Sequence, residues 1–211
     1  MQHTTSQILF DYWNEVRADR TAPPRIEIEP SRIAAILPDT LIIERLAPRK
    51  LRFRLAGTRV CEHFGMELRG VDFLGLWTAS DQNVLIDNID RTATDATAAT
   101  LGVKSVTTSG RMILSELILL PLSNRDGEIT RFMGAWSLSE QPAWAGLDYF
   151  VGHEIVDLEH VYSGPKQFGQ APRPTGEPPV FNADPAAKLI VHSRQRRFRV
   201  FDGGLAADRD R

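Results

Sequence analysis

The residues best suited to chemistry in this sequence are histidines and one cysteine, which fall in two short stretches. The segment HEIVDLEH carries His153 and His160 seven positions apart, with Glu154 between them. On a helix this spacing would place both imidazoles on one face, two turns apart, where a divalent metal could bind them together with a carboxylate. Pairs of this kind are common on protein surfaces, so we interpret them as surface residues and predict no metal site.

The second stretch holds Cys61 and His63, which on a helix point in different directions and are not expected to share a metal. Cys61 is the only cysteine, which excludes an internal disulfide and a zinc site built from several thiolates. A lone cysteine fits a reducing compartment, and the first residues lack the continuous apolar run of a signal peptide. We therefore expect a cytoplasmic protein.

Signatures of the large enzyme classes are missing from the sequence. No Ser, His and Asp can be assigned to a triad, and neither Gly-x-x-x-x-Gly-Lys nor Gly-x-Gly-x-x-Gly occurs. The net charge of -2 supplies no overall attraction to nucleic acid or to an anionic membrane, and no apolar run approaches the roughly 20 residues that span a bilayer. We predict no catalytic residue, no nucleic-acid partner and no membrane association.

A basic run, SRQRRFRVF, lies near the C-terminus. Its guanidinium groups could bind a phosphate-bearing ligand, because the fork of an arginine matches phosphate oxygens. We interpret the run as a solvated tail within a C-terminal arm. Its arginines are Arg194, Arg196, Arg197 and Arg199.

An amphipathic helix is predicted from residue 5 or 6, where Thr5 or Ser6 can cap it, to about residue 19. Its apolar stripe must be buried against the core, a second copy of the chain or another protein. We predict that the stripe mediates homodimerisation. It consists of Ile8, Leu9, Tyr12, Trp13 and Val16.

The core is expected within residues 39–140. Strands at 41–44 and 50–55 should form an antiparallel hairpin with Leu51, Phe53 and Leu55 pointing inward, because polar and apolar residues alternate there. The other expected elements are short helices at 58–64 and 70–77, a longer helix at 81–96, and strands at 103–108, 112–122 and 129–138.

This order predicts an α+β fold with one five-stranded antiparallel sheet and helices on one of its faces. Residues 1–38 would form a helical segment before the core, and residues 141–163 a helical extension after it. Residues 164–211 would form an arm rich in proline and glycine that ends in the basic run.

The stretch RFRLAGTRVCEHFGMELRGVDFLGLW, residues 52–77, resembles the strand-to-helix passage of the PAS-type sensory domains found in many alphaproteobacterial single-domain proteins. The resemblance is carried by Gly57, Gly65, Gly70 and Phe73. It implies a PAS-like fold with a signal-input role, in which a ligand or partner is sensed between sheet and helices and signalling proceeds through protein–protein interaction.

The resemblance names no cofactor. Haem would need an axial ligand such as His, Cys or Met, and the helix at 81–96 contains no histidine. In the light-sensing PAS branch the reactive cysteine stands in Asn-Cys-Arg, whereas Cys61 stands in Arg-Val-Cys-Glu-His. The signal therefore stays open.

A pocket in this fold would lie between the sheet and the helices. It could hold a small apolar ligand oriented by Arg54, Arg111 or the indole N–H of Trp136. Two alternatives are a ligand-free structural adaptor with a filled core, and an enzyme on a steroid-isomerase-like cone fold, in which helices largely precede the sheet. The predicted lining consists of Phe53, Leu55, Val60, Phe64, Phe73, Leu85, Ile89, Leu114 and Trp136.

Overall fold

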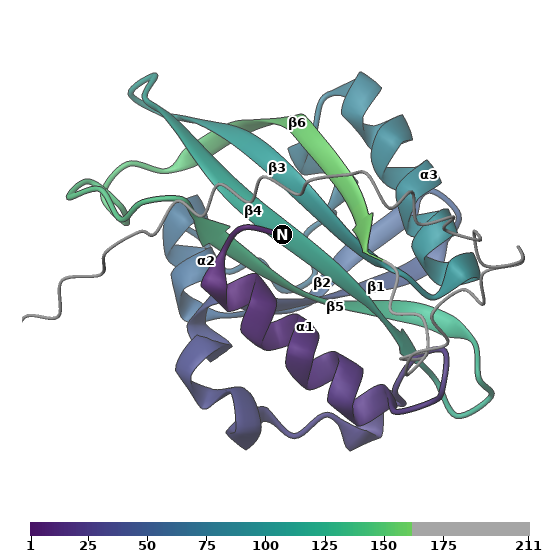
Figure 1. Ribbon diagram of the computed structural model, residues 1–211. Helices are drawn as coiled ribbons and strands as arrows, with labels where there is room; N and C mark the ends of the chain where they lie inside the picture. Colours follow the sequence, from purple (N-terminus) through teal and green to yellow (C-terminus); the bar gives the residue numbers. More distant parts are fainter. Residues whose placement is uncertain (162–211) are drawn as a thin grey trace, which may run out of the picture. The chain divides into compact units, whose positions relative to one another are not determined.

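A six-stranded antiparallel sheet forms the centre of the computed structural model, which describes residues 1–161 (Figure 1). The strand order is β2-β1-β5-β4-β3-β6, so the hairpin of β1 and β2 lies at one edge and β6 at the other. The strands are β1 (Thr40–Ala47), β2 (Lys50–Ala56), β3 (Ala98–Thr107), β4 (Met112–Ser123), β5 (Ile129–Leu138) and β6 (Phe150–Val161).

Helices cover both faces of the sheet. The inner face is covered by α2 (Thr58–Phe64), the short 3-10 helix η3 (Leu74–Leu76) and α3 (Ala79–Asp95). The outer face is covered by α1 (Thr4–Arg17), which lies in front of the sheet in Figure 1. Two 3-10 helices, η1 (Arg25–Glu27) and η2 (Pro30–Asp39), lead from α1 into β1. No helix among residues 1–161 is long and apolar enough to cross a membrane.

The predicted α+β fold is confirmed, with the core helices on one face of the sheet; the N-terminal helix α1 covers the other face, because the sheet is apolar on both sides. Along β4, Ile113 and Leu117 belong to the inner cluster, whereas Ile118 and Leu120 belong to the outer cluster beneath α1. An apolar sheet face must be packed against another element to leave water. The continuous apolar run of β4 therefore requires a layer on each side.

The sheet has six strands rather than five because residues 150–161, predicted to be helical, form β6. This strand pairs with β3 along its whole length and covers what would otherwise be an open edge. Phe150, His153, Ile155 and Leu158 turn toward the inner face. The sheet therefore extends past residue 140, while the predicted arm at 164–211 and its basic run lie outside the described residues.

The predicted helices at the start of the core are confirmed with different caps. His3 caps α1, since its Nδ1 accepts the backbone N–H of Thr5 at 3.2 Å, and Thr78 caps α3. Gly65 ends α2 with φ of +65°, in the left-handed region that favours glycine. A Cβ at Gly57 would lie 2.3 Å from two backbone oxygens of residues 37 and 38, so only glycine lets η2 approach β2 here.

Candidate functional site

Most of the residues predicted to line a pocket meet on the inner face. They pack in one cluster between the sheet, α2, η3 and α3, each at most 8% exposed. Their side chains fill the space between the layers at close contact, as protein interiors do. The residues brought together are Phe53, Val60, Phe64, Phe73, Leu85, Ile89 and Trp136.

The inward orientation predicted for Leu55 is wrong. Phe53 pairs with Ile43 but Leu55 pairs with Ile42, so Arg54 is an extra residue that bulges from β2. A bulge shifts the alternation of side chains by one position. Leu55 consequently lies on the outer face, where it is 44% exposed.

Four aromatic rings surround the imidazole of His153 on the inner face. The ring centroids lie 5.1 Å (Trp136), 5.2 Å (Phe64), 5.5 Å (Trp77) and 5.7 Å (Phe150) from that of His153. The two indoles stack on each other at 5.6 Å with an interplanar angle of 13°. We call these five residues the aromatic cluster.

His153 is held in its neutral form by this environment. The side chain is buried, and its Nδ1 shares a hydrogen bond of 2.9 Å with the hydroxyl of Ser105 on β3. Burial disfavours the charged imidazolium and lowers the pKa of His153 to about 4. At neutral pH the ring therefore acts as an uncharged donor or acceptor.

Two polar nitrogens at the aromatic cluster are buried without a hydrogen-bond partner among residues 1–161. They are Nε1 of Trp77 and Nε2 of His63, whose ring lies 5.5 Å from that of Phe150. By contrast, Nε1 of Trp136 donates to the hydroxyl of Ser115 at 2.9 Å. Leaving a buried polar group unpaired costs about 1–3 kcal/mol, so these two nitrogens are points where a bound molecule would gain hydrogen bonds.

The histidines of HEIVDLEH lie on a strand and not on a helix. His153 and His160 are seven positions apart, which on a regular strand would place them on opposite faces. A bulge at Val156 shifts the alternation by one position, so both side chains turn inward. His160 shares hydrogen bonds with Asn88 of α3 at 2.6 Å and with Thr97 at 3.2 Å. The surface interpretation is therefore wrong for His153. Within residues 1–161 no three His, Cys, Asp or Glu side chains converge as metal ligands would.

The cysteine and the arginines considered from the sequence lie away from the aromatic cluster. Cys61 is half-buried on α2, with its Sγ 3.9 Å from the carbonyl oxygen of Ala56. Arg54 is exposed on the β2 bulge, and Arg111 lies over the ring of Trp144. Of the groups predicted to orient a ligand, only the Trp136 indole lies in the cluster.

Sequence reasoning missed three members of the aromatic cluster: Trp77, Phe150 and His153. Trp77 follows η3 and forms a β-bridge with His153, which the helix predicted within residues 141–163 does not allow. Phe150 and His153 share the inward face at an odd spacing because the strand bulges at Val151, and this bulge is visible only when the partner strand is known. Without that partner, the same letters fit a helix equally well.

The apolar stripe of α1 is largely buried within the same chain. Leu9, Tyr12 and Trp13 pack on the outer face, and the Trp13 indole donates to the carbonyl oxygen of Pro121 at 2.8 Å. The remaining two residues, Ile8 and Val16, are exposed and half-buried respectively. The packing of the stripe is thus satisfied by the sheet, and homodimerisation through it stays a prediction.

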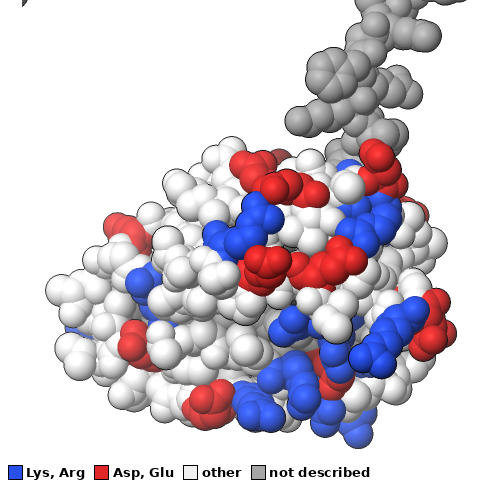
Figure 2. Space-filling view, turned by 90° about the horizontal axis from the view of Figure 1, so that it is seen from below, with Lys and Arg blue, Asp and Glu red and all other residues white. Residues whose placement is uncertain are grey.

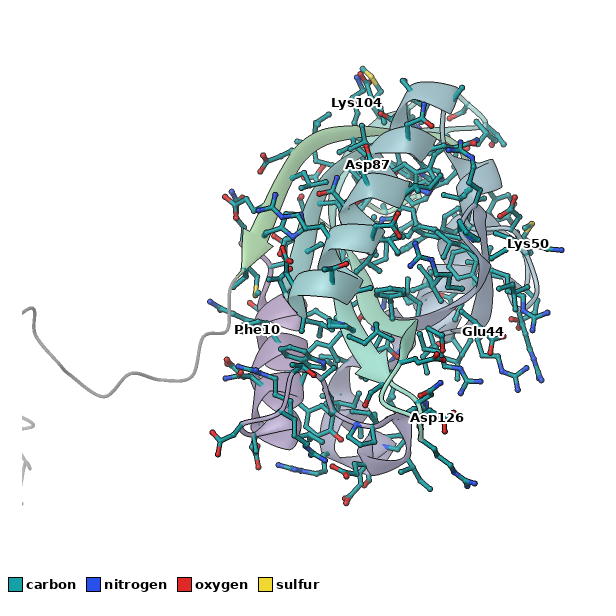
Figure 3. All side chains as sticks on the ribbon, turned by 90° about the vertical axis from the view of Figure 1, so that its right-hand side faces the viewer. Phe10, Glu44, Lys50, Asp87, Lys104 and Asp126 are labelled. Carbon is teal, nitrogen blue, oxygen red and sulfur yellow. The ribbon has the colours of Figure 1, made fainter. Side chains whose placement is uncertain are left out.

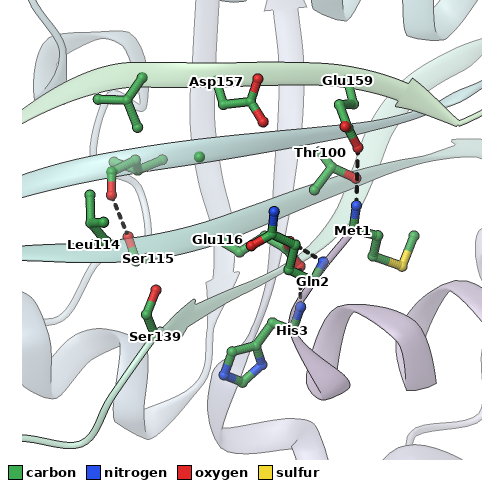
Figure 4. A pocket seen from close by; sticks show the side chains of 13 residues that line it. Met1, Gln2, His3, Thr100, Leu114, Ser115, Glu116, Ser139, Asp157 and Glu159 are labelled. Atoms are coloured by element: carbon green, nitrogen blue, oxygen red, sulfur yellow. Dashed lines mark hydrogen bonds and ion pairs between the residues drawn. The ribbon is translucent and has the colours of Figure 1, made fainter.

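A hollow of about 360 Å³ lies on the outer face where α1 begins (Figure 4). Leu114 lines it at 53% exposure, because it alternates with the inward Ile113, and its predicted inward orientation is wrong. The carboxylate of Glu116 accepts the backbone N–H groups of Gln2 at 2.6 Å and His3 at 3.1 Å. These bonds fix the start of α1 to strand β4.

Several solved structures of light-oxygen-voltage (LOV) proteins are similar to this chain. An RNA-binding LOV receptor is 15% identical with a TM-score of 0.41; the match covers 56% of this chain and 33% of that one. The dark structure of the blue-light photoreceptor Aureochrome1 LOV is 15% identical with a TM-score of 0.40, covering 55% and 84%. This chain therefore spans about a third of the length of the RNA-binding receptor. No curated protein matches.

A family model described as "PAS domain" matches residues 1–137, from the start of α1 nearly to the end of β5. The match includes the glycine and aromatic placements of residues 52–77 and the helices of the inner face. The order of elements, with a hairpin before α2 and α3, agrees with it and departs from the cone fold. The chain belongs to the PAS domain family.

Proposed function

We propose that this chain is a regulatory sensory module whose aromatic cluster binds a small molecule and whose response is passed to a protein partner. The observation that carries the proposal is the pair of buried, unpartnered nitrogens of Trp77 and His63 within a shell of rings. Stacked rings and buried ring nitrogens without partners suit a flat, largely apolar molecule with one or two polar atoms.

The sheet offers a physical route from the aromatic cluster to the outer face. On β5, Trp136 belongs to the inner cluster and its neighbour Ala135 to the outer cluster beneath α1. A ligand that separates the stacked indoles must displace β5 or the inner helices, because the layers are close-packed. Displacing β5 changes the surface on which α1 packs. A partner that binds one of the two conformations more tightly then responds to the ligand.

We also propose that the protein is cytoplasmic, which the single cysteine supports, and that it forms a homodimer. Since most of the α1 stripe is covered, a dimer would use what α1 leaves exposed, including Ile8. The ligand-free adaptor is the second candidate, favoured by the filling of the inner face. The same experiment separates the two.

The test is native mass spectrometry of freshly purified protein beside a denatured control. We expect a small molecule released on denaturation, and its loss from a Trp77→Phe variant, which removes the unpartnered N–H while keeping an aromatic ring. Trp144→Phe is the matched control, because Trp144 lies outside the aromatic cluster. A bare protein from several preparations, incubated with small-molecule extract of its source cells, would contradict the proposal and favour the adaptor.

A further inference from the structure

A second hollow, of about 410 Å³, lies on the outer face beside the edge strand β2. Its floor is apolar, and its rim carries four guanidinium groups from different parts of the chain. We call it the arginine hollow. It is lined by Arg25, Ile42, Arg54, Leu55, Ala56, Glu67, Arg69 and Arg131.

The bulge in β2 builds both parts of the arginine hollow. It gives Arg54 its place outside the regular pairing, and it turns Leu55 to the outer face opposite Ile42. The floor therefore gains an exposed leucine, and the rim an arginine. Bulges are common beside binding sites because they re-aim side chains in this way.

The charges of the hollow are not balanced by the described residues. Arg131 shares Glu44 with Arg52, at 2.8 Å and 2.7 Å, and these bonds lower the pKa of Glu44. Arg54 and Arg69 have no carboxylate within 4.0 Å among residues 1–161, and neither has Arg25.

The lining contains a single carboxylate, that of Glu67, which accepts the backbone N–H of Arg69 at 3.0 Å. By contrast, two arginines near α1 each have a carboxylate partner: Arg20 pairs with Glu27, and Arg32 with Glu15. Lys and Arg gather along the lower border of Figure 2, and Figure 3 shows Glu44 among long nitrogen-tipped side chains. A concentration of unpaired guanidinium groups on a chain of net charge -2 is the electrostatic pattern of an anion site.

We propose that the arginine hollow binds an organic phosphate, with the phosphate between Arg54 and Arg69 and the organic part over Ile42 and Leu55. Guanidinium forks match phosphate oxygens in charge and geometry. The volume and apolar floor exceed what a free phosphate ion needs and lie in the range of small-molecule sites. This site is on the opposite face from the aromatic cluster and does not depend on it.

The experiment is calorimetric titration of the full chain at low ionic strength with ADP, adenosine and inorganic pyrophosphate. We expect ADP to bind, adenosine not to bind, and Arg54→Gln and Arg69→Gln each to weaken ADP at least 10-fold. Arg125→Gln, an exposed arginine in the β4–β5 turn, is the matched control and should leave the affinity unchanged. Stronger binding of pyrophosphate than of ADP would show that the arginine hollow prefers a free inorganic anion. That result would overturn the proposal of an organic phosphate ligand.

Folding of the variants is checked by thermal unfolding without ligand. Removing one of several like charges should leave the midpoint temperature of unfolding equal to or above that of the parent chain. If Arg54→Gln fails to fold, Arg69→Gln provides the test. The proposal is overturned by no ADP binding at 1 mM, by equal affinity in both hollow variants and the parent, or by binding only to anionic phosphatidylserine vesicles.

Discussion

Replacing His153 with phenylalanine should make the protein less sensitive to mild acid. In the folded state the pKa of His153 is about 4, whereas an unfolded histidine titrates near 6.5. Between these values the unfolded chain binds the extra proton, so the free energy of unfolding falls as the pH falls. The loss begins near pH 6.5 and is complete below about pH 4.

The size of the effect follows from the difference between the folded and unfolded pKa values of His153. Each tenfold change in an acid dissociation constant corresponds to about 1.4 kcal/mol, so the full loss is about 3 kcal/mol and the loss at pH 5 is about 2 kcal/mol. His153→Phe keeps a ring in the aromatic cluster but cannot take up this proton. It also leaves the Ser105 hydroxyl without its partner, which lowers stability equally at every pH.

The assay is urea unfolding followed by far-ultraviolet circular dichroism at pH 7.5 and pH 5. From the higher to the lower pH, the free energy of unfolding of the parent should fall by about 2 kcal/mol more than that of His153→Phe. His153→Gln is a second non-titrating variant and should behave like phenylalanine. Equal losses in parent and variants would refute the assignment of His153 as a buried, neutral imidazole.

Three further predictions concern packing and a buried carboxylate. Leu9→Ala should lower the free energy of unfolding by about 2–5 kcal/mol, while Ile8→Ala, one position away and 43% exposed, should cost about 0.5 kcal/mol in the same urea titration. Gly57→Ala should cost about 1–3 kcal/mol through collision with η2, whereas Gly152→Ala, with open space around it, should be neutral by thermal unfolding. Asp148 accepts hydrogen bonds from hydroxyls of residues 107–109, and these bonds hold the pKa of its carboxyl below the usual range. Asp148→Asn should therefore lower the melting temperature at pH 7, and the decrease should be smaller at pH 3.

Local patterns in the sequence are sufficient to predict the early elements of the fold. The hairpin of β1 and β2, the short helix α2 and the long helix α3 lie close to their expected ranges. Each is specified within one stretch of chain, by alternation, by a cap or by a glycine at its end. The inward positions of Phe53, Phe64 and Trp136 follow from these patterns.

The errors arise where a residue's place depends on a partner far along the chain. Leu55 leaves the predicted face because the bulge at Arg54 is decided by pairing with β1, and no local pattern marks it. Residues 150–161 fit a helix as well as a strand, and their strand identity depends on the open edge of β3, about 50 residues earlier. Without that strand, His153 and the aromatic cluster cannot be predicted.

The burial of α1 shows a similar limit. The apolar stripe of α1 correctly indicates that these side chains must be buried, but the sequence alone does not show that the sheet has a second apolar face. Ile118 and Leu120 supply that face, and they alternate with residues of the inner cluster on the same strand. A fully buried strand does not reveal which helix covers which side.

The most direct test of the proposed sensor function is the indole N–H spectrum of ¹⁵N-labelled protein, assigned with single Trp→Phe variants. Spectra are recorded as purified, after refolding from denaturant, and after adding small-molecule extract of the source cells. We predict that the Trp77 and Trp136 resonances shift between these samples while that of Trp144, which lies outside the aromatic cluster with Arg111 over its ring, stays in place. Unchanged Trp77 and Trp136 resonances in all three samples would contradict a ligand at the aromatic cluster.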